Sequence, residues 1–556
     1  MADTRISERD IRIQKAQKLR ELWINPYAQS WDKNTSIGDL LSSLWREGGG
    51  TPDGFQWQSL RTIEEIISSP TTSISIAGRL MLKRVSGKLA FGQIMDETGQ
   101  IQLMWEHQSS KLLDSPLWRR GAGGEDWNPE LQQKIKQLMW TSEKPFDYWF
   151  IDKFLDVGDI IGVRGELFVT HKGELTVFVS EYQLLSKAIR PLGDKFHGIG
   201  EDNQETAYRQ RYLDMIFNRE SLERMKLRST FLKTIRDFYH ENGFMEIETP
   251  VLGNSASGAA AAPFVTHHND FDTEMYLRIS PETNLKKATV GMFEKIFEVA
   301  KDFRNEWSDP SHHQEFTMIE HYAAYRNHED NMRFTESMFN YIFEHIPQLS
   351  KTIQVADKNW VTKEVNFATP WQRIDYVSQI LKDSGINVAN YQEWDDELLR
   401  SDIKAAGHTW EWIDSQWLVT LIDYLYKKVT RPKIVGPAFI INYPKLMQPL
   451  ARQSDNNPNL VEQFQLLING WEILKAYSEL VDPIQQQVNF DAQLGALEAW
   501  DEEATKWDDD FVLAMEYGMP PQSGWGMGID RIFAMLTEQS NIRDVILFPM
   551  MKPEIQ

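Results

Sequence analysis

The spacing of apolar residues changes along the chain, and each change predicts a different kind of structure. Between residues 74 and 186, apolar and polar positions alternate in short runs such as ISIAGRLMLKRV and GELTVFVSEYQLL, which glycine-containing turns separate. A period of two is typical of half-buried β-strands. Roughly five such strands predict a small β-barrel, for which an OB-fold is a natural candidate.

The segments around this barrel lack that alternation. Residues 4–24 carry Ile, Ala and Leu at near-helical spacing among Arg and Lys, which predicts a basic amphipathic helix that either packs on its own domain or contacts phosphates. We assign residues 1–70 to an N-terminal helical extension and 71–190 to the barrel. Residues 106–147, rich in Trp and charge, are predicted to be a loop insertion, and the Pro/Gly-rich stretch that follows the barrel predicts a linker at 191–221.

After the linker, helical and strand patterns are mixed. RMKLRSTFLKTIRDFYHENGF predicts a long helix that stops at Gly243, and MEIETPVL a strand ending in Pro250. Residues 330–460 have the pattern of helices. IFEVAKDFRNE and EFTMIEHYAAY alternate again and predict an antiparallel hairpin, whose loop WSDPSHHQ contains Pro310.

This hairpin concentrates charged and aromatic residues. Alternate side chains of a strand share a face, so Arg304 is expected beside Glu306. The residues that share a face of the second strand are Phe316, Met318, Glu320 and Tyr322. If the two faces coincide, one cavity receives a guanidinium, carboxylates, a phenol and an aromatic ring. In isolation, an Arg–Glu pair on a solvated sheet face is the simpler interpretation.

A second motif near the end of the chain favours a ligand site. GWGMGIDRIFAML, residues 524–536, has three alternating glycines that lead into a helix beginning at Asp530 and Arg531. Glycines let a ligand lie flat against the backbone. The spacing is not the dinucleotide fingerprint, and no G-x-x-x-x-G-K-[ST] loop occurs in the chain. Phosphate binding here would therefore rely on arginine side chains.

These motifs, taken in order, resemble those of a known family. TPVL after the long helix, FRNE…EFTMIEHY and GWGMGIDR are similar to the three motifs of the class II aminoacyl-tRNA synthetases. KFHGIG…YRQRYLDM, SGAAAAPFVTHHN, MYLRISPE, AYSEL and DVILFPMMKP resemble the lysyl-tRNA synthetases in particular, over residues 70–556. The resemblance implies an α+β protein: an N-terminal OB-fold that binds the anticodon, and a catalytic domain at 222–556. That domain is an antiparallel sheet flanked by helices, with a helical insertion near 330–460.

The implied reaction is that of a lysine–tRNA ligase. L-lysine is activated by ATP to lysyl-adenylate and then transferred to the 3′ end of tRNA(Lys). Because the attacking lysine carboxylate is already ionised, catalysis consists of positioning and charge stabilisation. The resemblance makes Arg304 and Arg531 catalytic, with ATP as co-substrate and Mg²⁺ as cofactor. The implied ATP-binding residues are Arg304, Glu306, His312, Phe316, Glu472 and Arg531.

The resemblance also implies which residues bind the amino acid, the metal and the RNA. Glu282 would bind the α-ammonium group of lysine, and Glu479 with Tyr322 the ε-ammonium group. The full implied lysine-binding set is Gly258, Glu282, Glu320, Tyr322, Lys475, Tyr477 and Glu479. The implied metal ligands are Glu472 and Gln465, and the implied anticodon-binding residues are Phe91, Gln102 and Glu181.

Two of these positions depart from the family pattern. Gln465 stands where a metal-binding carboxylate is usual, and a Gln carbonyl binds magnesium more weakly. Lys475 stands where a smaller amide is expected near the carboxylate of the substrate. Both departures bear on metal stoichiometry and efficiency more than on the class of reaction.

Composition narrows the partners and the compartment. A net charge of −22 argues against indiscriminate DNA or RNA binding, and the absence of Cys excludes disulfides and Cys-based zinc sites. The charged N-terminus lacks the apolar core of a signal peptide, and no run is long enough to cross a bilayer. We therefore expect a cytoplasmic protein without membrane or DNA partners. The resemblance adds a homodimer, with the helix 222–242 and Pro250 near the interface.

Three alternatives stay open. The first is a sister synthetase for Asp or Asn, against which Glu479 argues because it would repel an acidic side chain. The second is a non-catalytic tRNA-binding or regulatory paralogue, with which Gln465 and Lys475 are consistent. The third is a ligase that lysylates a protein, but the known relatives of that kind resemble the catalytic domain alone.

Overall fold

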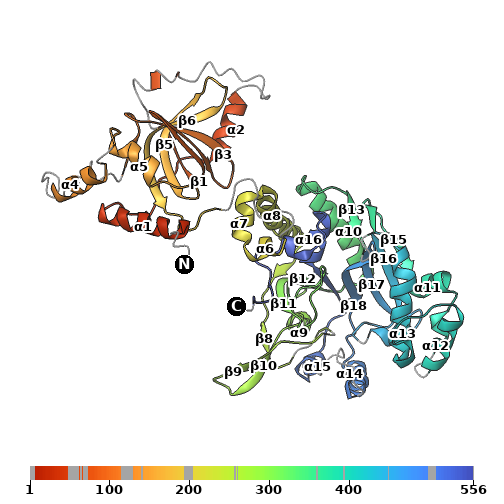
Figure 1. Ribbon diagram of the computed structural model, residues 1–556. Helices are drawn as coiled ribbons and strands as arrows, with labels where there is room; N and C mark the ends of the chain where they lie inside the picture. Colours follow the sequence, from red (N-terminus) through yellow and green to blue (C-terminus); the bar gives the residue numbers. More distant parts are fainter. Residues whose placement is uncertain are drawn as a thin grey trace, which may run out of the picture. The chain divides into compact units, whose positions relative to one another are not determined.

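A computed structural model describes residues 7–47, 62, 65–66, 73–113, 129–139, 142–192, 204–255, 258–259, 261–357, 361–391, 395–448, 450–498 and 509–554. The chain divides into two compact units, Met1–Gly198 and Ile199–Gln556 (Figure 1). None of the helices in the described residues combines the length and the hydropathy that a bilayer-spanning helix needs.

The first unit is built around a closed β-barrel. Its strands are β1 (Ile74–Ser86), β2 (Leu89–Met95), β3 (Gln100–Glu106), β5 (Ile160–Val169) and β6 (Leu175–Ser186). They are ordered β3-β2-β1-β5-β6, and β3 pairs with β6 as well, which closes the barrel; the short β4 (Lys111–Leu112) adds to β6. Burial alternates along β2, as the period of two predicts. The predicted OB-like barrel is confirmed.

Helices pack on this barrel: α1 (Glu8–Glu21), α2 (Ile37–Glu47), α4 (Pro129–Leu138) and α5 (Phe146–Lys153). In α1, the buried Arg12 donates to the carbonyl oxygens of Val157 and Ala188, at 3.0 and 3.3 Å, and Lys15 pairs with Asp156 at 2.6 Å. These cations are therefore engaged within their own unit, which supports the packing interpretation of the basic helix.

The segment 106–147 is not purely a loop, contrary to our expectation. Besides the residues outside the described ones, it contains β4 and α4. Leu131 and Ile135 lie one helical turn apart on α4 and are buried in the apolar cluster of the barrel. Burial of this i, i+4 pair helps to stabilise the helix, and the surrounding charged residues obscured the pattern in the sequence.

The second unit contains an eight-stranded sheet in the order β15-β16-β17-β18-β19-β12-β11-β7. Its strands are β7 (Met245–Glu246), β11 (Lys295–Phe303), β12 (Glu315–Ala324), β15 (Gln372–Asp375), β16 (Ala438–Pro444), β17 (Leu460–Ile468), β18 (Trp471–Ser478) and β19 (Gln522–Gly528). The central pairs are antiparallel, whereas the outer pairs β7–β11 and β15–β16 are parallel. The predicted α+β class is confirmed, with a sheet that is mixed at its edges rather than wholly antiparallel.

One face of this sheet is covered by α8 (Arg219–Glu241), α10 (His328–His345) and α16 (Ile529–Leu536) (Figure 1). The strand residues buried against these helices include Ile319, Phe464, Leu474, Ala476, Trp525 and Met527. Because side chains alternate along a strand, the residues between them point to the opposite face. That opposite face carries the candidate site.

Several further elements complete the unit. The predicted linker 191–221 contains α6 (Gln204–Arg209) and α7 (Arg211–Phe217), and its residues 193–203 lie outside the described part. The other elements of the unit are β8 (Leu252–Gly253), β9 (Val265–His268), β10 (Thr273–Leu277), α9 (Glu282–Val290), β13 (Thr352–Ala356), β14 (Thr362–Asn366), α11 (Tyr376–Ser384), α12 (Asp396–Ala405), α13 (Leu418–Leu425), α14 (Pro483–Glu498) and α15 (Asp509–Glu516).

The structure differs from the sequence-based prediction in one strand and in one helical segment. MEIETPVL is not one strand, because only Met245–Glu246 and Leu252–Gly253 are paired, on either side of Pro250, which has no N–H to donate. The segment 330–460 is helical in α10 to α13 but also contributes β13 to β16. Those strands span at most seven residues each, too few for a periodic signal to stand out.

Candidate active site

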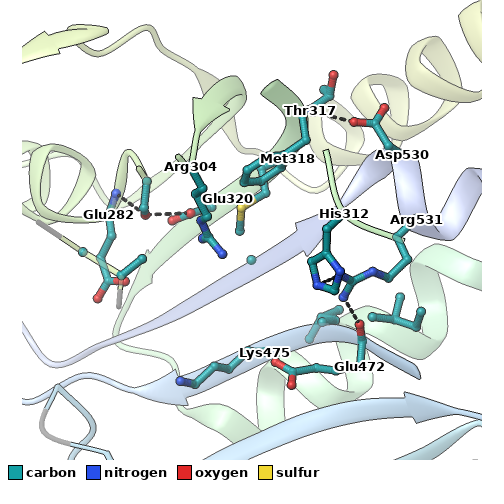
Figure 2. A pocket seen from close by; sticks show the side chains of 18 of the residues that line it. Glu282, Arg304, His312, Thr317, Met318, Glu320, Glu472, Lys475, Asp530 and Arg531 are labelled. Carbon is teal, nitrogen blue, oxygen red and sulfur yellow. Dashed lines mark hydrogen bonds between the residues drawn. The ribbon is translucent and has the colours of Figure 1, made fainter. Parts of the chain in front are cut away.

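A cavity of about 530 Å³ opens on the face of the eight-stranded sheet that the helical core leaves free. The predicted residues that line it are Gly258, Glu282, Arg304, Glu306, His312, Phe316, Glu320, Tyr322, Glu472, Lys475, Tyr477 and Arg531. Of the residues predicted for ATP, lysine and metal, Glu479 and Gln465 alone are not among the lining residues. Figure 2 shows two ends, with Glu282 and Glu320 at one and His312 and Arg531 at the other.

The strand register explains why residues distant in sequence meet here. One row across β17, β18, β19 and β12 pairs Gln465 with Lys475, Lys475 with Gly526 and Gly526 with Glu320. The next row is Gln463, Tyr477, Gly524 and Tyr322. Directly opposed residues of neighbouring strands place their side chains on the same face. The members of these rows on β18, β19 and β12 form the floor of the cavity.

The hairpin places Arg304 at the centre of the cavity, although not as part of a strand. β11 ends at Phe303, and the N–H of Glu306 turns back to the carbonyl of Arg304 at 2.9 Å. The prediction that Arg304 and Glu306 share a face of one strand is therefore wrong, because both lie beyond the end of β11, and Glu306 is exposed. The guanidinium of Arg304 lies 5.1 Å from the centre of the Phe316 ring, and its hydrogen bonds to the described residues are two long ones, both 3.4 Å, to the carbonyl of Ile279. Its planar fork stays available to an anion.

We call the end with His312 and Arg531 the nucleotide end, because these residues are predicted to bind ATP. There, Arg531 is held by backbone rather than by a carboxylate. Its Nη1 donates to the carbonyl of Glu472 at 2.7 Å, and Nη2 lies 3.0 Å from His312 Nε2. Because a guanidinium can only donate, His312 Nε2 must accept, and the proton resides on Nδ1, which donates to Asp309 at 2.7 Å. Burial lowers the pKa of Arg531, although the charge of Glu472 opposes that shift. A phosphate would relieve this cost of burial.

We call the end with Glu282 and Glu320 the amino-acid end, because these residues are predicted to bind lysine. It is organised around a residue that the sequence did not predict, Lys286. Lys286 of α9 is buried, and its Nζ lies 2.6 Å from Glu282 Oε1 and 2.5 Å from Glu479 Oε2. Tyr477 Oη also donates to Glu282 Oε1, at 2.6 Å. Glu282 and Glu479, predicted to bind the two ammonium groups of lysine, are thus close together and share a resident ammonium group.

Two glycines give these groups room. A Cβ on Gly524 would lie 2.2 Å from Glu479 Oε1, so no larger residue fits there without moving that carboxylate. The Glu479 carboxylate therefore lies over Gly524, on the face of the sheet that carries the cavity, although Glu479 is not itself a lining residue. Gly258, with φ +90°, packs against Glu282, where a Cβ would approach its Cβ to 2.8 Å.

Burial gives the carboxylates of this end unusual acidities. Burial raises the pKa of Glu479 to about 8; the charge of Lys286 opposes the shift and that of Glu282 adds to it. For Lys286, burial acts to lower the pKa, but the two carboxylates reverse this and raise it, so the ammonium form is held. Burial also raises the pKa of Glu320, whose Oε1 accepts from Ser280 Oγ at 2.9 Å. A cation that entered the cavity would find desolvated, hydrogen-bonded carboxylates.

The two departures from the family pattern are direct neighbours in the sheet. Lys475 points into the cavity from β18 below Arg304 (Figure 2), and burial lowers its pKa although Glu472 and Glu282 oppose the shift. Gln465 is its partner on β17, and Gln465 Oε1 already accepts from Tyr443 Oη at 2.7 Å. Within the described residues, no group of three or more His, Asp or Glu could hold a metal ion. The pair predicted to bind magnesium therefore contains one carboxylate, that of Glu472, and one amide oxygen that Tyr443 already engages.

The residues predicted to contact an anticodon lie in the first unit. Phe91 on β2 is half-buried against a cluster that includes Met104 and Phe178. It lies opposite Met104, so Gln102, two residues earlier on β3, shares its face. Glu181 on β6 pairs with Arg164 at 3.5 Å. Their contact with RNA stays a prediction.

Of the two residues that the sequence did not predict, Lys286 had a recognisable sequence signal and Ser280 had none. ETNLKK places Glu282 and Lys286 at i and i+4, a spacing that brings side chains together on a helix. That Glu479 would complete the group depends on a tertiary contact between α9 and the end of β18. Ser280, which binds Glu320, offered no pattern beyond its place next to Pro281.

Similarity to proteins of known family identifies the family to which the chain belongs. Residues 203–552 match the family described as tRNA synthetases class II (D, K and N). The chain therefore belongs to the class II tRNA synthetases of this group.

Within the group, the chain is similar to lysine–tRNA ligases over nearly its whole length. It is 38% identical to the lysine–tRNA ligase of Magnetococcus marinus over 541 residues, which cover 97% of this chain and 96% of the relative. The lysine–tRNA ligase of Staphylococcus saprophyticus is 36% identical and covered completely, with 99% of this chain aligned. That of Aquifex aeolicus is 40% identical, over 86% of this chain and 73% of the relative. The predicted family is confirmed.

Proposed function

We propose that the protein is a lysine–tRNA ligase, which activates L-lysine with ATP and transfers it to the 3′ end of tRNA(Lys). The observation that carries this proposal is that two buried carboxylates, Glu282 and Glu479, lie close together around Lys286, and that Glu282 lines the same cavity as Arg304. The chain is also similar to lysine–tRNA ligases along its length. A buried acidic pocket is complementary to a substrate with two ammonium groups. It rejects neutral side chains because their entry would leave a buried carboxylate without a partner.

In the first step, a carboxylate oxygen of lysine forms a bond to the α-phosphorus of ATP, and the bond to pyrophosphate breaks. No proton has to be removed from the nucleophile. Arg304 would hold the α-phosphate and the attacking carboxylate together and neutralise the charge that develops on the phosphate oxygens. Arg531 and His312 would bind the outer phosphates, and Phe316 would stack on adenine. Lys475 would lie near the junction of the two substrates.

Magnesium would enter with ATP. Mg²⁺ commonly uses one or two carboxylates together with substrate phosphates, and Glu472 supplies one. When bound, the ion would offset charge on the phosphates. Gln465 is assigned no part in this binding, because its oxygen is engaged by Tyr443.

The second step needs the tRNA. The barrel, with Phe91, Gln102 and Glu181, would bind the anticodon by stacking and hydrogen bonding, and a homodimer in the cytoplasm is the expected form. These assignments rest on the family resemblance.

Amino-acid-dependent exchange of pyrophosphate into ATP tests the first step, and charging of a tRNA(Lys) transcript tests the second. Of the twenty amino acids, we expect lysine to support pyrophosphate exchange and then to be transferred to the tRNA. Exchange with aspartate or asparagine would replace the substrate assignment. No exchange with any amino acid would leave the non-catalytic paralogue, with which Gln465 and Lys475 are consistent. Lysine exchange without charging, but with lysylation of a protein, would support the remaining alternative.

A further inference from the structure

Lys286 is surrounded by the chemistry that recognises an ammonium group. Its Nζ contacts two carboxylates and lies 5.5 to 5.9 Å from the centres of three aromatic rings, those of Tyr322, Tyr477 and Phe511. Cations are stabilised over such ring faces. These groups come from β12, β18, α9 and α15, so four elements converge on one buried charge.

The way in which the carboxylates use their oxygens is informative. Glu282 receives both Lys286 and Tyr477 on Oε1, and no described residue donates to its Oε2. Glu479 faces Lys286 with Oε2, while its Oε1 lies against Gly524 of the cavity floor, and the backbone N–H of Gly524 also acts on this carboxylate. Each carboxylate therefore binds the resident cation on one oxygen, and among the described residues no side chain donates a hydrogen bond to the other oxygen. Two oxygens remain for a ligand with two ammonium groups.

We propose that Lys286 is a positioning residue that determines specificity: it fixes the separation of Glu282 and Glu479, and so sets the distance between the two ammonium groups that the pocket accepts. This inference rests on the proposed function, because it takes the ligand to be a diamino acid. Lys286 acts through the carboxylates and contacts no substrate. Without a central cation, two buried carboxylates repel each other, and one would move apart or take up a proton.

The charge count supports this role over simple competition with the substrate. Glu282, Glu320 and Glu479 carry three negative charges when ionised, and Lys286 offsets one of them. The two that remain equal the two ammonium groups of lysine. Lys475 and Arg304 lie toward the phosphate side, where the carboxylate of the substrate and ATP bring the opposite charge.

The test is lysine binding by calorimetry to the full chain, without ATP, for the wild type and Lys286→Met. Methionine has a similar length and no charge. We expect the dissociation constant for lysine to rise about 30-fold or more, as for loss of one partner in a buried charge pair, while that for ATP changes less than about twofold. Lys286→Arg keeps the charge and should bind lysine within about fivefold of the wild type.

The preference for lysine over ornithine, which is one methylene shorter, provides the readout specific to positioning. A fixed separation distinguishes the two by about tenfold or more, and Lys286→Met should reduce this ratio to about twofold or less. The pH at which lysine affinity changes should also move upward by about one unit or more, because Glu479 loses the cation that opposes its raised pKa. The groups that face this site and remain are Glu282, Glu320, Tyr322, Lys475 and Tyr477.

Lys287→Met is the matched control. Lys287 is the neighbour of Lys286 on α9 but points outward to Asp510 at 2.7 Å, so its loss should leave lysine binding unchanged. If Lys286→Met does not fold, Tyr477→Phe removes the second donor to Glu282 Oε1 and should lower the lysine-to-ornithine ratio in the same direction, by about threefold.

The outcomes separate this inference from the proposed function. If the wild type binds no lysine and supports no lysine-dependent exchange, the proposed function fails. If the wild type binds lysine but Lys286→Met binds it equally well or more tightly, or keeps the ornithine ratio, Lys286 is a structural residue or a competitor. The inference is then overturned while the function stands.

Discussion

The two ends of the cavity hold their charged groups in different ways. At the amino-acid end, Glu282 and Glu479 are paired with the protein's own Lys286, and all three are buried. At the nucleotide end, Arg531 and Arg304 donate mainly to backbone carbonyl groups, and the two bonds of Arg304 are long.

From this difference we infer that one end of the cavity selects the amino acid and that the other end accelerates the reaction. Charges fixed by charged partners keep one geometry before the substrate arrives, which favours discrimination between similar amino acids. Arginines that exchange weak carbonyl contacts for phosphate gain most when negative charge develops, which favours rate. Substitutions at the first end should therefore affect the lysine KM, and substitutions at the second end kcat or the ATP KM.

The largest expected effect is that of Arg304→Ala. Its guanidinium is the group best placed at the junction of the two substrates, and removal of one such donor commonly lowers kcat by about 10²–10³-fold. We expect a loss near the upper limit in lysine-dependent pyrophosphate exchange, with a lysine KM within about threefold of the wild type. Arg304→Lys, which keeps the charge but not the fork, should recover only part of the rate. A large rise in lysine KM with unchanged kcat would place Arg304 at the wrong end.

Glu479→Gln should give the largest effect on substrate affinity. A neutral amide cannot balance an ammonium group and leaves Lys286 with one carboxylate, so we expect the lysine KM to rise about 100-fold and the ATP KM to change less than threefold. Steady-state exchange kinetics measure both. Glu462→Gln is the control. Glu462 lies on β17, pairs with Arg452 at 2.9 Å and does not line the pocket. Equal effects on both KM values would contradict the division of the cavity.

The pH dependence of the wild type should differ between the two ends. Glu479 has a pKa raised to about 8, so its ionised fraction grows about fivefold between pH 7 and 8, while the amino groups of lysine stay largely protonated. Because the ammonium group binds the ionised carboxylate, the lysine KM should fall by about the same factor, and the ATP KM should stay level. A lysine KM that rises or stays flat over this range would mean that Glu479 is already ionised or does not face the substrate.

Phe316→Leu should have the smallest effect. The ring lies beside the guanidinium of Arg304, at 5.1 Å, and offers a flat surface for adenine. Leucine keeps the apolar character and loses the stacking, so the ATP KM should rise about threefold without change in the lysine KM. An unchanged ATP KM would show that adenine stacks elsewhere.

The sequence predicted the hairpin, the glycine motif and the barrel because each has a local period or a fixed spacing. β11, β12, β19 and α16 lie where those patterns indicate. It did not predict the parallel edge strands or α4, whose local signals are short. The Glu282–Lys286 pair was visible as an i, i+4 spacing, but its meaning depends on Glu479, which approaches only in the folded unit. The departures at Gln465 and Lys475 were visible individually, whereas their cross-strand pairing required the register of β17 and β18.

We propose that fixed charges at one end of the cavity recognise both ammonium groups of lysine. Calorimetric titration of the full chain with lysine and with norleucine, which has the same chain length but no ε-ammonium group, tests it most directly. Lysine should bind about a thousandfold more tightly or better, because norleucine would leave Glu479 buried without its ligand. Affinities within about tenfold of each other would contradict the account.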